Sequence, residues 1–198
     1  MFDRACSVIT DDTADMVSGI AFHWYSGDHF DAVRLVKERF PNKHLTFSEG
    51  CIEYSRFDTN QIRNAQMYGH DMIGNIAAGM DTYIDWNICL DEQGGPNYVG
   101  NYCEAPIICD TANGTLSYKL SFYYISHFSS FIKSGAKRVA TTIYTDEIEQ
   151  VAFINPDGSM VVVIQNRTAV VMNTSLRIDS KLIDVELPAD SISTIIIK

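Results

Sequence analysis

The stretch LTFSEGC, residues 45–51, decides how the rest of this sequence is interpreted. Four residues that suit a buried strand lead directly to a carboxylate, Glu49, which is followed by Gly50 and Cys51. One interpretation is a strand that ends in a loop, with Glu49 as its first solvated residue, because most acidic side chains are exposed. The other is a carboxylate that a rigid strand positions for chemistry. The flanking segments favour one of the two.

Segments of strand and helix character alternate on both sides of residues 45–51. GIAFHWY (19–25) has the composition of a buried strand, and residues 28–40 place apolar side chains at helical spacing. Residues 58–79 have a second helical pattern, and TYIDWNICL (82–90) is predicted to be a third strand. Strand, helix, strand, helix, strand is typical of parallel β/α units.

Polar and aromatic residues follow each of these predicted strands. They are His23-Trp24-Tyr25, Glu49 and Trp86-Asn87. In a β/α barrel the carboxyl ends of the strands share one face, and that face carries the chemistry. This placement favours a functional carboxylate at Glu49 over a merely solvated one.

The pattern changes from about Arg138 to short β-rich runs. Asn155-Pro156-Asp157-Gly158 forms a strong turn signal between two of them. The runs are RVATTIYT (138–145), EQVAFIN (149–155), MVVVIQN (160–166), TAVVMN (168–173) and STIIIK (193–198). We therefore predict an antiparallel sheet, part of a sandwich, after a helix over 117–132. The predicted domains are residues 1–135 and 136–198.

Charge excludes one class of partner. The formal net charge is -10, with 25 acidic residues against 15 basic ones, and no Lys/Arg cluster interrupts this balance. A nucleic-acid backbone would be repelled, so we predict no nucleic-acid partner. No apolar run is long enough to span a bilayer and the first residues lack the apolar core of a signal peptide, so we expect no stable membrane insertion.

The cysteines carry no metal pattern. The five, Cys6, Cys51, Cys89, Cys103 and Cys109, are scattered and include no Cys-x-x-Cys pair. We expect buried free thiols, which favour a reducing compartment such as the cytoplasm without fixing the localisation, and neither a metal nor another cofactor. We expect Cys51 to be a buried thiol and not a nucleophile, because no histidine is placed to activate it.

Six motifs occur in an order that resembles glycoside hydrolase family 30, in its glucosylceramidase branch. They are GIAFHWY (19–25), FPNKHLTFSEGC (40–51), YIDWNICLDEQGGPNYVGN (83–101), APIICD (105–110), FYYISHFSSFIKSGAKRV (122–139) and VAFINPDGSMVVVIQN (151–166). The resemblance extends from about residue 18 to the end of the sequence. It implies the C-terminal portion of a (β/α)8 TIM barrel, about strands 6–8, followed by an antiparallel β-sandwich segment.

The resemblance also implies roles for individual residues. Glu49 matches the catalytic nucleophile of the family, and His23 and Tyr25 match residues that shape the sugar site. Trp86 matches an aromatic residue of the sugar pocket, and Asn101 matches a residue that hydrogen-bonds glucose hydroxyls. From the residues alone, His23-Trp24-Tyr25 could equally form a core cluster, Trp86 could be a core residue, and Asn101 could be an ordinary loop asparagine.

One expected part of the catalytic machinery is missing. A retaining glycosidase needs two carboxyl groups about 5 Å apart. The resemblance places the acid/base in an Asn-Glu pair, and no such dipeptide occurs in this sequence. We therefore expect a fragment that is inactive alone, with open barrel edges covered by a missing N-terminal part or by self-association. The expected substrate is a β-glucoside or a related glycan or glycolipid, such as glucosylceramide. The alternative is a non-catalytic carbohydrate-binding or assembly remnant of such an enzyme.

Overall fold

The computed structural model describes all residues from Met1 to Lys198, and packing divides them into two compact units. The barrel unit comprises residues 1–59 and 74–119, and the sandwich unit comprises residues 60–73 and 120–198. Helix α3 (Gln61–Ala78) contributes residues to both units. The predicted division into domains at residues 135/136 stays a prediction, since the packing units do not follow a single cut in the chain.

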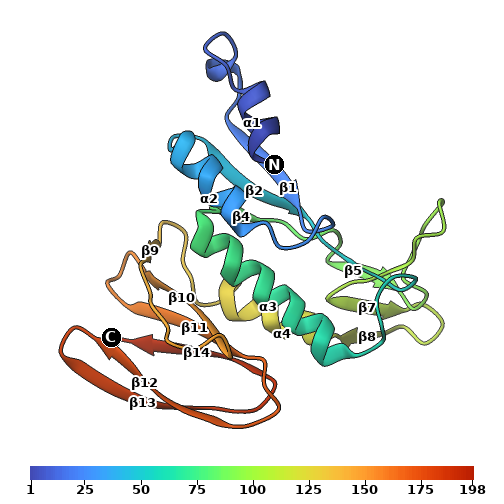
Figure 1. Cartoon of the computed structure of the whole chain (residues 1–198). Helices are drawn as coiled ribbons and strands as arrows, with labels where there is room; N and C mark the ends of the chain where they lie inside the picture. Colours follow the sequence, from blue (N-terminus) through green and yellow to red (C-terminus); the bar gives the residue numbers. More distant parts are fainter. The chain divides into compact units, whose positions relative to one another are not determined.

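A three-stranded parallel sheet forms the centre of the barrel unit (Figure 1). Strand β2 (His44–Glu49) lies between β1 (Gly19–His23) and β4 (Thr82–Tyr83) and runs parallel to both. Helix α2 (Phe30–Arg39) connects β1 to β2, and α3 connects β2 to β4. The predicted alternation of strands and helices is confirmed.

Apolar side chains of α1 (Phe2–Val8), α2 and β2 build a core beside this sheet. Every second residue of β2 points inward, which buries Leu45 and Phe47 completely. Val33 and Val36 lie three residues apart on α2, so they share the helix face that packs against Leu45. Each such side chain contributes about 1.5–3 kcal/mol on full burial, which fixes the strand that carries Glu49.

The predicted strand 82–90 is wrong as a single element. Beyond β4 the chain is irregular and bends at Trp86 and Ile88, although Ile84 still donates a backbone hydrogen bond to Phe47 (2.8 Å) and Trp86 donates one to Gly50 (3.3 Å). Strand β2 ends at Glu49, so no ladder remains for the following residues. Cys89–Asp91 (β5) joins a different sheet, in which the order is β5-β7-β8.

Several further elements complete the barrel unit. Strand β8 takes residues that we predicted as the start of a helix, because Tyr118 pairs with Ile107. These elements are the 3-10 helix η1 (Ala14–Met16), β3 (Ile52–Glu53), β6 (Cys103–Glu104), β7 (Ile107–Asp110) and β8 (Thr115–Tyr118). Strands β3 and β6 pair antiparallel.

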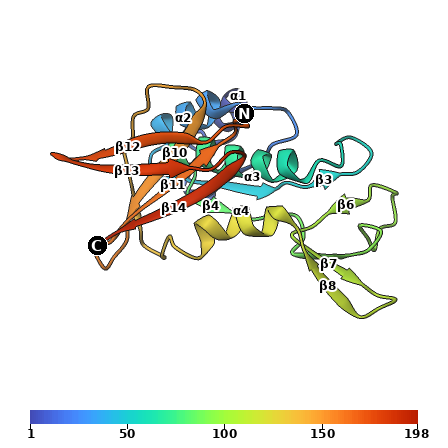
Figure 2. The same cartoon turned by 90° about the horizontal axis from the view of Figure 1, so that it is seen from below.

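The sandwich unit contains the predicted antiparallel sheet, with α4 (Leu120–Ser129) belonging to the same unit. The strands follow the order β14-β11-β10-β9 (Figure 1). Figure 2 shows β10, β11 and β14 of this sheet from below. Their bounds are Lys137–Val139 for β9, Ile148–Ile154 for β10, Met160–Asn166 for β11 and Ser191–Ile197 for β14. A separate hairpin consists of β12 (Met172–Ile178) and β13 (Lys181–Leu187).

The hairpin packs against the four-stranded sheet to form the sandwich core. Leu187 of β13 is fully buried with Ala152, Val162 and Ile164 of the sheet. Asn166, at the end of β11, is also fully buried, and its side-chain Nδ2 donates to the backbone oxygens of Val170, Leu187 and Pro188. This one amide therefore ties the loop after β11 to the end of the hairpin.

Candidate active site

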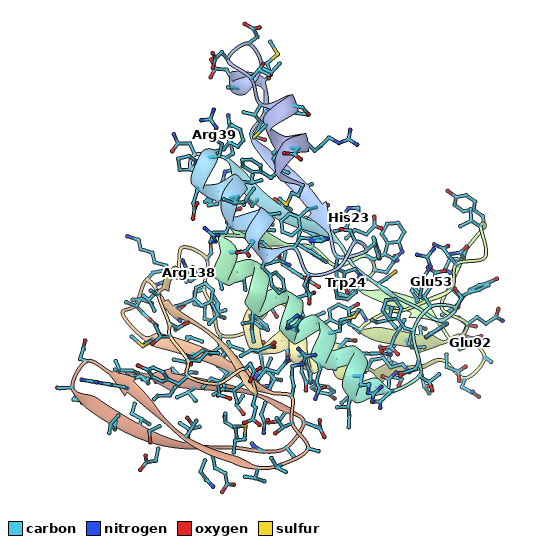
Figure 3. The ribbon with its side chains drawn as sticks, viewed as in Figure 1. His23, Trp24, Arg39, Glu53, Glu92 and Arg138 are labelled. Carbon is cyan, nitrogen blue, oxygen red and sulfur yellow. The ribbon has the colours of Figure 1, made fainter.

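An irregularity in the pairing of β1 with β2 places Glu49 beside His23. The two strands pair in register from Gly19 with His44 to Phe22 with Phe47, and the register then passes over Ser48 so that His23 is aligned with Glu49. A β-bulge of this kind re-aims side chains and is common next to active sites. Figure 3 shows His23 where β1 ends.

The bulge gives Glu49 a partner without closing it off. His23 Nε2 lies 4.0 Å from Glu49 Oε2 and 3.2 Å from Ser48 Oγ, at hydrogen-bonding distance. The Glu49 side chain is 27% exposed and that of His23 is 41% exposed. A carboxylate held by a strand end and still open on one side can reach a ligand, which is what a nucleophile requires.

Aromatic rings pack around the end of the strand that carries Glu49. The buried ring of Phe47 stacks on Tyr83 at 4.5 Å between centroids and contacts Trp24 edge-on at 5.9 Å. A Cβ atom added at Gly50 would lie 2.7 Å from the Phe47 ring and 3.0 Å from Trp24. Glycine follows Glu49 because aromatic rings fill the space that a side chain there would need.

Tyr25 connects the His23 ring to the thiol of Cys51. Its ring contacts the His23 ring edge-on at 5.7 Å, and its hydroxyl lies 3.5 Å from Cys51 Sγ. Burial, with further contributions from Cys51 and Glu49, raises the pKa of Tyr25 above its ordinary value. The Tyr25 hydroxyl therefore keeps its proton at neutral pH and can act as a hydrogen-bond donor.

Asn101 is held by the loop that precedes it. Asn97 Nδ2 donates to the backbone oxygen of Asn101 (3.0 Å) and to its side-chain Oδ1 (2.5 Å). Asn97 Oδ1 accepts from the backbone N–H groups of Val99 and Gly100. The Asn101 side-chain oxygen is thus engaged, which leaves the Nδ2 group as the donor that a ligand would meet.

Trp86 is anchored by its backbone and open at its ring. The backbone N–H of Trp86 donates a hydrogen bond to the backbone oxygen of Gly50, the residue after Glu49. Trp86 is nevertheless 49% exposed. The core interpretation of Trp86 is therefore wrong. A half-exposed indole of this kind offers a flat apolar surface on which a sugar ring can pack.

The five predicted site residues are connected to different degrees. Glu49, His23 and Tyr25 are direct neighbours. Asn101 is connected to them through Cys103, because Cys103 Sγ contacts the Asn101 carbonyl at 3.3 Å and Cys51 Sγ at 3.2 Å. The sequence-based inference missed Cys103, although it lies only two residues after Asn101.

The cysteines only partly match the prediction of buried free thiols. All five are free, and Cys51 and Cys103 are buried, as predicted for Cys51. Cys89 is exposed and Cys6 and Cys109 are partly exposed, so the prediction is wrong for these three. The irregular segment 84–88 explains why Cys89 is exposed. We expected Cys89 to be buried in a continuous strand over 82–90, and that strand ends before it.

Other features of the structure are less informative about function. No group of three or more His, Cys, Asp or Glu side chains is arranged to hold a metal ion. None of the helices is long and apolar enough to cross a bilayer. A groove of about 690 Å³ lies in the sandwich unit, and its lining contains none of the predicted site residues.

Family models match almost the whole chain. The glycosyl hydrolase family 30 TIM-barrel domain matches residues 3–132, and the glycosyl hydrolase family 30 beta sandwich domain matches residues 135–195. The lysosomal acid glucosylceramidase of Mus musculus is 37% identical over 180 residues, which are 85% of this chain and 35% of that protein. Putative glucosylceramidase 4 of Caenorhabditis elegans is 34% identical over 191 residues, which are 91% of this chain and 36% of that protein.

Solved structures agree with these matches. The crystal structure of SrfJ from Salmonella typhimurium has a TM-score of 0.95 and 38% sequence identity, and the match covers 99% of this chain and 44% of that one. The chain thus spans about a third of the length of the curated relatives it matches. Its fold is the C-terminal portion of a TIM barrel followed by a β-sandwich segment, and the chain belongs to glycoside hydrolase family 30.

Proposed function

We propose that this chain carries the nucleophile of a retaining β-glycosidase, with Glu49 as that nucleophile and a β-glucoside as the substrate. The observation that carries the proposal is the bulge that aligns Glu49 with His23 at the carboxyl end of β2. The names of the relatives, which include glucosylceramidases, support a glucoside such as glucosylceramide.

The proposed mechanism is a double displacement. Glu49 attacks the anomeric carbon, the glycosidic bond breaks, and a covalent glycosyl-enzyme forms; water then releases the sugar. His23 lies beside the carboxylate, and the protonated Tyr25 hydroxyl supplies a donor on the same side of the site. Trp86 and Asn101 are proposed to bind the sugar by ring packing and through the Asn101 Nδ2 donor.

The leaving oxygen must receive a proton from a second carboxyl group. The Asn-Glu pair expected to provide it does not occur in these 198 residues. We propose that the chain alone performs no turnover and that a further polypeptide segment supplies this group. In the three-stranded sheet β1 and β4 each pair on one side only, so such a segment, or a second copy of the chain, has strand edges to bind.

The test uses a substrate that needs no acid. The substrate is a 2-deoxy-2-fluoro-glucoside with a dinitrophenyl leaving group. That leaving group departs without protonation, so the substrate reports on the nucleophile and its surroundings alone. We expect the intact mass of the 198-residue chain to increase by one fluoroglucosyl group. The adduct disappears in Glu49→Gln.

Glu53 provides the matched control. It lies four residues after Glu49, and trypsin leaves both carboxylates in one peptide, residues 44–56, so peptide mapping by itself does not separate them. Glu53→Gln should keep the adduct, because the Glu53 carboxylate pairs with Arg56 at 3.0 Å. An adduct that survives Glu49→Gln would refute the assignment.

A non-catalytic carbohydrate-binding remnant is the second candidate function. The half-exposed Trp86 ring favours it, since that surface needs no nucleophile to bind a sugar. Saturable binding of a β-glucoside without any covalent adduct would support this function over the first. An apparent molecular mass in solution that rises with protein concentration would show instead that the chain associates with itself.

A further inference from the structure

Two thiols, one of them two residues after the candidate nucleophile Glu49, are in contact. Cys51 Sγ and Cys103 Sγ are 3.2 Å apart, and the residues are 7% and 2% exposed. A disulfide has an S–S distance of about 2.05 Å, so the two sulfurs need to approach by about 1.2 Å. No other residue separates them.

The backbone already brings the two segments together. Strands β3 and β6 pair antiparallel with Glu53 opposite Cys103, which places Cys51 diagonally across from Cys103. Diagonal neighbours on antiparallel strands share one face of the sheet, and here the two Sγ atoms already lie 3.2 Å apart. A bond between them would join positions 52 residues apart in the sequence without requiring a new arrangement of strands.

We propose that Cys51 and Cys103 are an oxidation site, at which a small peroxide converts the two thiols into a disulfide bond next to Glu49. Hydrogen peroxide is the oxidant, since the slight exposure of Cys51 admits a small molecule. The net reaction consumes two thiols and one peroxide and gives one disulfide and two waters.

The two sulfurs have different roles in this reaction. Burial, assisted by the adjacent Cys51, raises the pKa of Cys103 to about 12, so its thiol stays protonated and bonds to the Asn101 carbonyl. Cys51 Sγ attacks a peroxide oxygen, a nucleophilic role that the sequence did not lead us to expect; the O–O bond breaks, and the released hydroxide and the proton that Cys51 loses form water. The resulting sulfenic acid is attacked by Cys103; the S–O bond breaks, and the leaving hydroxide takes the Cys103 proton.

The disulfide would change the surroundings of the candidate site. It would fasten the segment that holds Asn101 to Cys51, two residues after Glu49, and displace the Tyr25 hydroxyl from its thiol partner. The inference does not rest on the proposed glycosidase function, because oxidation of the thiols is measured by mass and not by activity.

The experiment treats the full chain with hydrogen peroxide, alkylates the remaining thiols and digests with a protease that cleaves after glutamate. Trypsin is unsuitable because it leaves Cys89, Cys103 and Cys109 in one peptide. Cleavage after glutamate gives GCIE (50–53) and QGGPNYVGNYCE (93–104), each with one cysteine. We expect these two peptides to be linked, with a mass about 2 Da below their sum, and to be released by dithiothreitol.

Two variants sharpen the result. Cys109→Ser should form the same link, whereas Cys103→Ser should stop at a sulfenic acid on Cys51 that a dimedone reagent labels. The wild-type digest decides the question even where Cys103→Ser fails to fold. Linked peptides in the wild type support the proposal. The proposal would be overturned if peroxide oxidised Cys89, or oxidised Cys51 to a sulfinic acid, while peptides 50–53 and 93–104 stayed unlinked.

Discussion

Trp86 exposes about half of its surface beside the residue that follows Glu49. If its indole packs on a sugar ring, Trp86→Ala removes an aromatic contact of about 0.5–1.5 kcal/mol. We expect the rate of covalent capture of the fluoroglucoside to fall about 2- to 12-fold. The measurement is the time course of adduct formation by intact mass, with the urea midpoint recorded to show that stability is retained.

Tyr144, a fully exposed aromatic residue of the sandwich unit, provides the comparison for Trp86. Tyr144→Ala should leave the capture rate unchanged. Equal rates in wild type and Trp86→Ala would show that the ring has no part in sugar binding.

Single residues also show where inference from the sequence stops. The position of Glu49 at a strand end follows from the apolar run before it. Its alignment with His23 does not, because the bulge at Ser48 depends on how β1 and β2 pair, and no Gly or Pro marks it. The contact between Cys51 and Cys103 is likewise a product of tertiary pairing, which residue spacing does not encode.

The loop from β5 to β6 is organised around glycine and aspartate. Asp91 Oδ1 accepts from the backbone N–H groups of Gln93 and Gly95. Gly94 has φ +85, and a Cβ there would lie 2.3 Å from the carbonyl oxygen of Cys103. Both the backbone conformation and the close backbone contact require glycine at this position.

Gly94→Ala should therefore destabilise the chain by about 2 kcal/mol or more, from left-handed strain plus displacement of the β6 backbone. Urea unfolding followed by tryptophan fluorescence measures the change. Gly100→Ala is the matched control, because Gly100 has φ +83 and no atom within 4 Å of an added Cβ. Equal losses in both variants would mean that the contact with Cys103 contributes nothing.

Helix α4 and strand β14 meet at a partly buried histidine. His127 Nδ1 and Thr194 Oγ1 are hydrogen-bonded at 2.8 Å, and burial lowers the pKa of His127. The folded chain therefore prefers neutral His127. Its contribution to stability is complete above the unfolded pKa of about 6.5 and is lost as the pH falls through the lower folded value.

His127→Asn tests this titration, since asparagine keeps a polar group for Thr194 and does not titrate. Between pH 7 and pH 5 the wild type should lose more unfolding free energy than the variant, by at most about 1.4 kcal/mol per pH unit. Urea midpoints across that range provide the measurement. Parallel pH curves for the two proteins would contradict the expectation.

On the scale of the whole molecule, periodicity predicted the order of layers well. The alternation of strands and helices up to residue 119 and the β-rich remainder both appear in the structure. Strand β13 (Lys181–Leu187) was missed, although Ile183, Val185 and Leu187 alternate with charged residues as in a half-buried strand. We assigned segment 84–88 to a strand because its composition suits one. Composition does not show that the neighbouring strand β2 ends at Glu49 and leaves this segment without a strand to pair with.

The buried amide of Asn166 has a consequence for how the chain can be produced. Asn166-Arg167-Thr168 has the pattern of an N-glycosylation acceptor, yet the Asn166 side chain is fully enclosed and bonded to three backbone carbonyls. A glycan could be attached there only before the end of β11 packs against the hairpin, and would then keep that core open. In a secretory host the folded population should therefore be unmodified at Asn166. The exposed turn at Asn113, which begins the same acceptor pattern Asn113-Gly114-Thr115, should be modified instead.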